Sequence, residues 1–190
     1  SWVFTSATLT VDNRFDHFIA RLGLGDPETQ RLDSPFDYQR NALLYLPSGL
    51  PAPNAGNYLD CFLDRAETVL AASRGRAFLL FTSHRALQQA AQRLRSSLDL
   101  ELLVQGEASQ QRLLDRFRAS GHAVLLGTQS FWEGVDVRGQ ALSVVMIDKL
   151  PFASPADPVV QARVESLREQ GGNPFMQYQL PHAVITLRQG

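Results

Sequence analysis

The ten residues from Gly127 to Asp136 carry the side chains best suited to binding a nucleic acid or a nucleotide. Gly127 permits a close approach of the backbone, and the hydroxyls of Thr128 and Ser130 can donate hydrogen bonds to phosphate oxygens. The carboxylate of Asp136 is an acceptor suited to a ribose hydroxyl or a bound cation. A Gly-x-Asp sequence alone would indicate a surface turn with a capping serine and solvated acidic residues. The whole string is too particular for such a turn, and we therefore expect a binding loop.

Two further polar clusters follow apolar runs of the chain, at Thr82–Arg85 and at Asp148–Lys149. If these runs are strands of one open parallel sheet, all three clusters lie beyond the carboxyl ends of strands, where ligands gather in such sheets. One polar strand end is ordinary, but three on one edge predict a binding surface. We expect Ser83, Thr128 and Lys149 to lie together along this edge.

The elements that must position these residues follow from the alternation of short apolar runs with amphipathic segments. This pattern predicts an α/β fold with a mainly parallel sheet and helices on both faces. The predicted strands are Asn41–Leu46, Ala77–Thr82, Leu100–Val104, Ala123–Gly127 and Leu142–Ile147. The predicted helices lie near Tyr58–Ala72, His84–Ser97, Ser109–Ala119 and Pro158–Gln170, and a last helix begins near Pro181. The core-facing stripe of the second helix is predicted to be Leu87, Ala90, Ala91, Leu94 and Leu98.

The composition limits the classes of protein to which the chain can belong. Its 190 residues, 44% of them hydrophobic, suffice for one well-buried core. A net charge of −1 argues against retention on DNA by overall positive charge, although a local basic track remains open. The single cysteine, Cys61, excludes a disulfide framework and an iron–sulfur cluster ligated by cysteines of this chain. The four histidines lack the spacing of metal ligands. Solvated helix faces are expected for Arg93, Arg95, Arg112, Arg116 and Arg118.

The chain resembles the XPD-like superfamily 2 DNA helicases, in particular their DinG/YoaA branch. Gly127–Asp136 resembles helicase motif V in the Phe-Trp-Glu-Gly-Val-Asp form of that branch. Further matches, in family order, are Thr5–Leu9 with motif III, Leu80–Ser83 with motif IV, Val104–Gly106 with a short Gln-Gly element, Asp148–Phe152 and Pro155–Pro158 with the segment after motif V, and Leu187–Gly190 with the opening of motif VI. The resemblance covers essentially the whole chain. It implies a RecA-like fold and identifies residues 1–190 as the second motor domain of an ATP-dependent DNA helicase, a fragment of a longer chain.

The resemblance also implies site residues, position by position. The implied catalytic residues are Glu133 and Gln189, and the implied nucleotide-binding residues are Gly134 and Asp136. The implied DNA-binding residues are Ser83, Thr128 and Ser130, and Ser6 and Thr8 are implied to couple the state of the nucleotide to DNA binding. No metal-binding residue is assigned. Ser83 is also the expected N-cap of a helix, a role that is compatible with a contact to a DNA phosphate.

The resemblance implies ATP and Mg²⁺ as cofactors, bound mostly by a first motor domain that this sequence lacks. The sequence holds no Gly-x-x-x-x-Gly-Lys-Ser/Thr loop and no Asp-Glu-x-His box, so the fragment alone is expected to be inactive. Any iron–sulfur cluster would lie outside it. The expected partners are single-stranded DNA, the first motor domain and, as a further candidate, a clamp-loader subunit. No apolar run approaches the roughly 20 residues of a membrane span, and the sequence is poor in cysteine, so we expect a cytoplasmic protein. The resemblance implies a bacterial one.

Two alternatives remain open. The first is a non-catalytic module with a helicase-like fold that holds single-stranded DNA or a replication partner. The second keeps the fold and adds a nuclease domain, as some DinG-type chains do.

Overall fold

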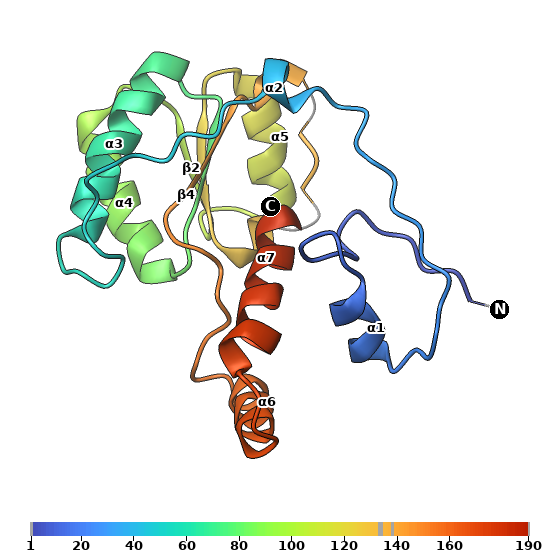
Figure 1. Ribbon diagram of the computed structural model, residues 1–190. Coiled ribbons are helices and arrows are strands. Elements are labelled where there is room, and N and C mark those ends of the chain that lie inside the picture. Colours follow the sequence, from blue (N-terminus) through green and yellow to red (C-terminus); the bar gives the residue numbers. More distant parts are fainter. Residues whose placement is uncertain (1, 133–134, 138, 190) are drawn as a thin grey trace. The chain divides into compact units, whose positions relative to one another are not determined.

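The computed structural model describes residues 2–132, 135–137 and 139–189 (Figure 1). These residues divide into two compact units, which are described one at a time. The first unit comprises Ser1–Leu46 and Pro151–Gln189, and the second comprises Pro47–Leu150. In the described residues, no helix combines the length and the apolar character that a membrane span needs.

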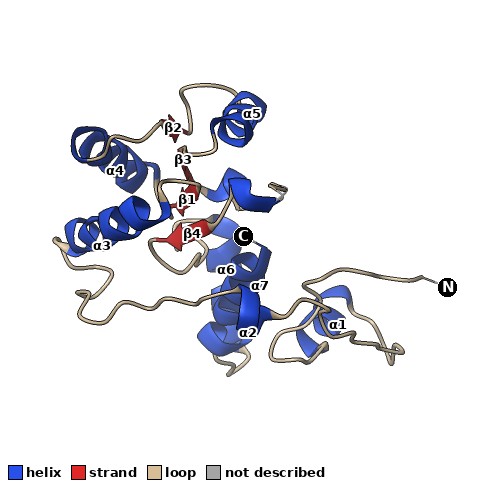
Figure 2. Ribbon diagram, turned by 90° about the horizontal axis from the view of Figure 1, so that it is seen from above, coloured by secondary structure: helices blue, strands red, loops and turns tan. Residues whose placement is uncertain are grey.

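The second unit contains a four-stranded parallel sheet. The strands are β1 (Ala77–Leu80), β2 (Leu102–Val104), β3 (Val124–Gly127) and β4 (Val144–Ile147), in the order β2-β3-β1-β4. Its helices are α3 (Tyr58–Ser73), α4 (His84–Ser97) and α5 (Gln110–Ser120). Figure 2 shows α3 and α4 on one face of the sheet and α5 on the other. The predicted α/β fold, with a parallel sheet covered on both faces, is confirmed.

The core of this unit lies on both faces of the sheet because its strands are apolar at successive positions. Every residue of β1 and of β3 is buried, as expected for strands covered on both sides. Ala77 and Leu79 join the core cluster formed with α3 and α4. Phe78 points the other way, and its ring lies 4.7 Å from that of Phe117 on α5. The alternation of side chains along β1 therefore fixes which helices cover which face.

Helix α4 has the bounds that its sequence pattern predicts. It begins after Ser83, whose hydroxyl accepts a hydrogen bond from the Ala86 N–H at 3.2 Å. The first four residues of its predicted stripe are buried. The fifth, Leu98, lies just past the helix and packs against the core from a partly buried position.

The first unit contains α1 (Asp16–Leu22), α2 (Tyr38–Asn41), α6 (Pro158–Glu169) and α7 (Leu180–Gln189), which a π-helical turn, Phe175–Gln179, precedes. The Asp157 carboxylate caps α6 through the N–H groups of Val159 and Val160. The sequence pattern predicts α6 and α7 to within a few residues but does not predict α1 or α2.

The predicted strand Asn41–Leu46 is wrong. Asn41 ends α2, and residues 42–46 belong to no described strand or helix. Leu43 is 90% exposed, so this apolar run is not part of the core of its unit. An apolar run is typical of a segment that is buried against another surface, but it does not specify that this surface is a neighbouring strand.

Candidate functional site

The carboxyl edge of the sheet brings together the polar residues that follow the strands. Leu80 of β1 is in register with Gly127 of β3 and with Ile147 of β4. The residues that follow these three strands include Ser83, Thr128 and Lys149, respectively. Because all the strands are parallel, the three residues lie at the same edge, as the sequence predicts.

Thr128 is buried, with 7% of its surface exposed, and its polar groups are bound to Gln105. The amide oxygen Oε1 of Gln105 accepts from the Thr128 backbone N–H at 2.6 Å and from its hydroxyl at 3.0 Å. The turn continues with a hydrogen bond of 2.8 Å from the Phe131 N–H to the Thr128 carbonyl. Gly127 is required here, because a Cβ at this position would lie 2.8 Å from the Phe131 side chain. These contacts thus hold the start of the loop in a defined conformation.

Asp148 is the buried acidic group of this edge, with 3% of its surface exposed. Its Oδ1 accepts from the Thr82 backbone N–H at 3.0 Å, and its Oδ2 lies 3.5 Å from the Thr82 hydroxyl. Burial raises the pKa of the Asp148 carboxyl, although the hydrogen bonds from Thr82 and the charge of Lys149 oppose the change. The Tyr58 hydroxyl donates to the Asp148 carbonyl, and the pKa of Tyr58 is raised by burial and by the nearby Asp148 charge.

A cleft of about 170 Å³ opens beside these residues, lined among others by Ser83, Arg85, Asp148 and Lys149. The Lys149 ammonium lies 5.2 Å from the centre of the Tyr58 ring, in cation–π contact. The first N–H groups of α4 have no partner within their helix, and the helix dipole places partial positive charge at this end. Two cations and a helix N-terminus therefore make this cleft suited to an anion.

The rest of the motif V-like loop is described in part. Ser130 is exposed, and its carbonyl accepts from the Gln110 side chain at 2.9 Å. Asp136 is exposed, and its carbonyl accepts from the Arg118 guanidinium at 2.9 Å. The predicted residues Glu133 and Gly134 lie outside the described residues.

The first unit brings together the remaining predicted site residues. The Gln189 side-chain amide donates to the Thr8 hydroxyl at 3.3 Å, and the Ser6 hydroxyl lies 3.2 Å from that of Thr8. Arg188 donates to the carbonyls of Thr10 at 2.9 Å and of Ala7 at 3.4 Å. The segment that resembles motif III is therefore tied to the end of α7.

Comparison with known proteins decides the family. Residues 66–190 match the model of the helicase C-terminal domain. This chain is a helicase C-terminal domain of the DinG/YoaA type. It is 48% identical over its full length to the ATP-dependent DNA helicase YoaA of Escherichia coli K12, of which it covers 30%. It is 40% identical over its full length to the 3'-5' exonuclease DinG of Bacillus subtilis, of which it covers 22%. Over 99% of the chain it is 39% identical to the ATP-dependent helicase DinG of Mycobacterium tuberculosis H37Rv, of which it covers 29%.

The resemblance to the DinG/YoaA branch is therefore confirmed. The chain spans less than a third of the length of each of these relatives.

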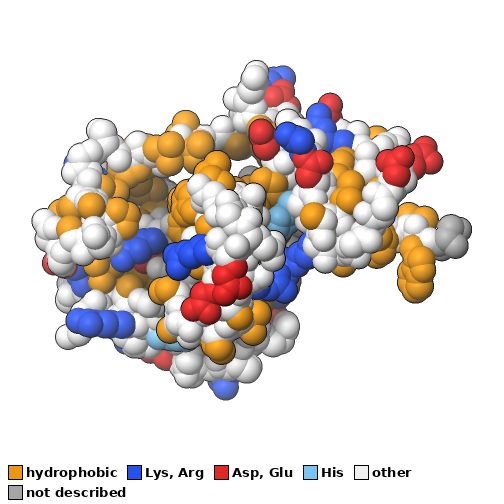
Figure 3. Space-filling view, turned by 60° about the horizontal axis from the view of Figure 1, so that its bottom comes forward, with side chains coloured by type: hydrophobic (Ala, Val, Ile, Leu, Met, Phe, Trp, Pro, Cys, Tyr) orange, Lys and Arg blue, Asp and Glu red, His pale blue; other side chains and the backbone are white. Residues whose placement is uncertain are grey.

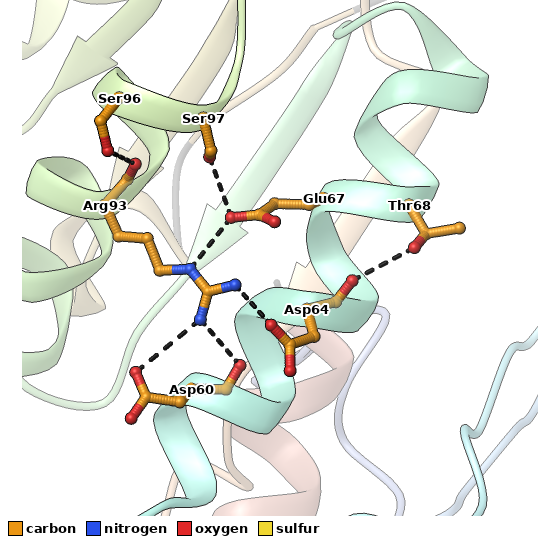
Figure 4. Close-up of polar contacts among 7 residues, drawn as sticks. All are labelled: Asp60, Asp64, Glu67, Thr68, Arg93, Ser96 and Ser97. Atoms are coloured by element: carbon orange, nitrogen blue, oxygen red, sulfur yellow. Dashed lines mark hydrogen bonds and ion pairs between the residues drawn. The ribbon is translucent and has the colours of Figure 1, made fainter.

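Four of the five arginines expected on solvated helix faces, Arg93, Arg95, Arg116 and Arg118, form ion pairs in this helicase C-terminal domain. Arg93 of α4 is held by α3, as Figure 4 shows: its Nε donates to Glu67 Oε1 at 3.0 Å, its Nη1 donates to the Asp60 carbonyl at 3.1 Å, and its Nη2 pairs with Asp64. The hydrogen bonds from Arg93 to Asp64 and Glu67 raise the Arg93 pKa further. Arg93 is thus only partly solvated, because carboxylates of α3 hold its guanidinium while 30% of its side chain remains exposed.

The other paired arginines are closer to the solvated state that the sequence predicts. Arg95 pairs with Glu107, and Arg116 lies 2.7 Å from Glu101. Figure 3 shows basic and acidic side chains interspersed with hydrophobic ones on the face drawn there. The cations that line the cleft are Arg85, in the first turn of α4, and Lys149, which follows β4.

Among the described residues, no group of three or more His, Cys, Asp or Glu side chains could hold a metal ion.

The position of Lys149 after an apolar run placed it on the predicted binding edge, whereas sequence reasoning assigned no role to Gln105. Gln105 directly follows β2, as Thr128 directly follows β3, so the same positional signal would have found it. Lys149 carries a second signal, since it is the only lysine in a chain with 17 arginines.

Proposed function

We propose that residues 1–190 are the C-terminal motor domain of an ATP-dependent DNA helicase that acts in repair on single-stranded DNA and its junctions with duplex. The domain supplies part of the DNA track and one wall of the ATP cleft. The observation that carries this proposal is the gathering of Ser83, Thr128 and Lys149 at one edge of the sheet of a helicase C-terminal domain. The similarity of the chain to an ATP-dependent DNA helicase YoaA and to an ATP-dependent helicase DinG supports it.

In this proposal the DNA backbone runs along the carboxyl edge, where Ser83, Thr128 and Ser130 bind phosphates. Hydroxyls and a helix N-terminus suit phosphate oxygens, and they cannot form the bidentate pairs that distinguish bases. The positive charge of Lys149 beside Ser83 adds attraction that is independent of sequence. The domain therefore holds single strands of any sequence.

Four residues of the chain are proposed to contact the nucleotide. Glu133, Gly134 and Asp136 act from the motif V-like loop, and Gln189 faces the γ-phosphate. Support for a coupling role of Ser6 and Thr8 comes from the 3.3 Å hydrogen bond that joins Thr8 to Gln189. A shift of the nucleotide at Gln189 would reach the motif III-like turn through this bond.

The remaining ligands of ATP and Mg²⁺ belong, in this proposal, to the first motor domain of the same protein. The described residues do not form a metal site, and the sequence lacks a phosphate loop. Exposed apolar side chains of the first unit, such as Trp2 at 89% exposure, support a partner surface that covers them. An iron–sulfur cluster, a clamp-loader contact and residence in the bacterial cytoplasm belong to the same proposal for the whole protein.

The test is ATP turnover by the full-length protein with and without single-stranded DNA. The proposal expects turnover that rises with DNA, and no turnover by the isolated 190-residue chain. A full-length protein that binds single-stranded DNA without hydrolysing ATP would favour the non-catalytic binding module instead.

A further inference from the structure

The side chain of Gln105 holds Thr128 in place at the carboxyl edge. Gln105 follows β2, and its own backbone N–H donates to the Leu126 carbonyl of β3 at 3.0 Å. Its Oε1 then accepts two hydrogen bonds from Thr128, one from the backbone at 2.6 Å and one from the hydroxyl at 3.0 Å. Two bonds from one residue fix both the main chain and the side chain of Thr128.

The direction of the second bond follows from the first. A backbone N–H only donates, so the Gln105 atom that faces Thr128 is the amide oxygen and not the amide nitrogen. An amide oxygen only accepts, so the Thr128 hydroxyl donates its proton to it. A hydroxyl carries one proton, and a DNA phosphate oxygen is also an acceptor. The hydroxyl can therefore donate to Gln105 or to a phosphate, but not to both at the same time.

We propose that Gln105 is a positioning residue for the DNA contact at Thr128. Without DNA it holds the buried hydroxyl, and when a phosphate arrives the proton turns from Oε1 to the phosphate oxygen. The backbone bond remains and keeps Thr128 in place during this exchange. The exchange favours DNA, because a hydrogen bond to a charged oxygen is stronger than one to a neutral amide. This inference rests on the proposed contact between Thr128 and DNA.

The neighbouring contacts suit this role. Gln110 holds the next turn by donating to the Ser130 carbonyl at 2.9 Å, and Gly127 gives the Phe131 side chain the room that it needs. The turn is thus anchored on either side of Thr128, and the hydroxyl proton can change partner without movement of the chain.

The experiment compares Gln105→Met with wild type in the full-length protein. Methionine has a similar length and offers no strong acceptor. Fluorescence anisotropy with a labelled oligonucleotide is expected to show about three- to tenfold weaker binding of single-stranded DNA. The DNA concentration that half-saturates ATP turnover is expected to rise by the same factor, with less effect on the KM for ATP. The matched control is Gln111→Met, at an exposed glutamine of α5 that bonds to Asp115, and it is expected to bind DNA normally.

A double-mutant cycle with Thr128→Val separates positioning from a general loss of structure. If Gln105 acts through Thr128, the double variant loses clearly less DNA affinity than the product of the two single-variant losses. Losses that multiply fully would overturn the positioning role and leave the proposed function standing. Normal DNA binding by Gln105→Met, together with weak binding by Thr128→Val, would have the same consequence. Normal DNA binding by Thr128→Val overturns the positioning role and the proposed contact together.

A second substitution keeps the test decisive if Gln105→Met folds poorly by thermal unfolding. Gln105→His, measured at pH 8, presents one acceptor nitrogen on a neutral ring. Its DNA affinity is expected to lie between those of wild type and Thr128→Val. A histidine variant that folds normally but binds DNA as weakly as Thr128→Val would overturn the role of the acceptor.

Discussion

The backbone N–H of Thr82 donates a 3.0 Å hydrogen bond to the Asp148 carboxylate, across 66 positions of sequence. This bond joins the residues that follow two neighbouring strands, β1 and β4. It also gives a buried carboxylate a partner beside the cleft that Lys149 lines.

The first prediction concerns pH. A raised pKa means that folded Asp148 binds its proton more tightly than unfolded Asp148, so ionisation of the carboxyl lowers the stability of the wild type. Asp148→Asn keeps an acceptor for Thr82 and never ionises. Its stability relative to wild type is therefore expected to rise as pH rises from the ordinary aspartate value of 3.8 towards neutrality. Urea denaturation over that range measures the difference, and a difference that is constant or shrinks with pH would contradict the assignment.

The second prediction concerns Thr128. Thr128→Ala in the full-length protein is expected to weaken the binding of single-stranded DNA severalfold, since a neutral hydrogen bond contributes about 0.5–1.5 kcal/mol. Homopolymer and mixed strands should be affected alike, and DNA-stimulated ATP turnover should fall. Thr68→Ala, at an exposed threonine that bonds only within α3, is the control in both assays. A loss confined to certain sequences would mean that Thr128 reads bases.

The third prediction concerns Asp136, which is expected to act on nucleotide rather than on DNA. Asp136→Ala should lower ATP turnover while leaving nucleotide-free DNA binding nearly intact. Asp99→Ala, at another exposed aspartate, should affect neither. If Asp136→Ala loses DNA affinity and Thr128→Ala does not, the two roles within the loop are reversed.

The fourth prediction concerns Lys149. Each phosphate neutralised on a single strand contributes about 0.7 to the slope of log affinity against log salt concentration. Lys149→Gln is expected to reduce the slope by about that amount, while Lys149→Arg keeps the charge and hence the slope. Because Lys149 is the only lysine of the chain, its modification by an amine reagent can be followed on one peptide, and single-stranded DNA should protect it. Equal modification with and without DNA would remove Lys149 from the track.

The fifth prediction concerns the link between α3 and α4. Arg93 is 30% exposed and contacts three acidic residues, so Arg93→Met is expected to cost about 1 kcal/mol or more, above the median of exposed ion pairs. Arg95→Met removes a single, half-exposed pair with Glu107 and should cost less. Equal midpoints for the two variants in urea denaturation would show that the Arg93 contacts contribute no more stability than the pair of Arg95 with Glu107.

The sequence predicts local structure well where one signal decides it. A serine cap and an apolar stripe define α4, and apolar runs of four residues mark β1 and β3. The predicted strand Asn41–Leu46 is wrong, because an apolar run does not specify its partner.

The candidate site is predictable to the same degree. Ser83, Thr128 and Lys149 share an edge because each follows a parallel strand, and position in the chain reveals this. The hydrogen bond between Gln105 and Thr128 forms because β2 lies beside β3 in the sheet. The order of the strands cannot be predicted from a local sequence pattern. Thr8 and Gln189 are likewise joined across 181 positions.

The common direction of the four strands makes the two ends of the sheet unequal for protein engineering. The turn at Gly121, which is exposed and lies just before β3, belongs to the amino end and is far along its strand from Thr128. A fluorophore or an affinity tag inserted there would leave the opposite end untouched. Gly75, at the same end, offers no such freedom, because a Cβ would lie 1.9 Å from the His122 carbonyl oxygen. Attachment sites on this domain are therefore best sought by insertion in the turn at Gly121 and not by substitution of Gly121 itself, because its φ of 70° favours glycine.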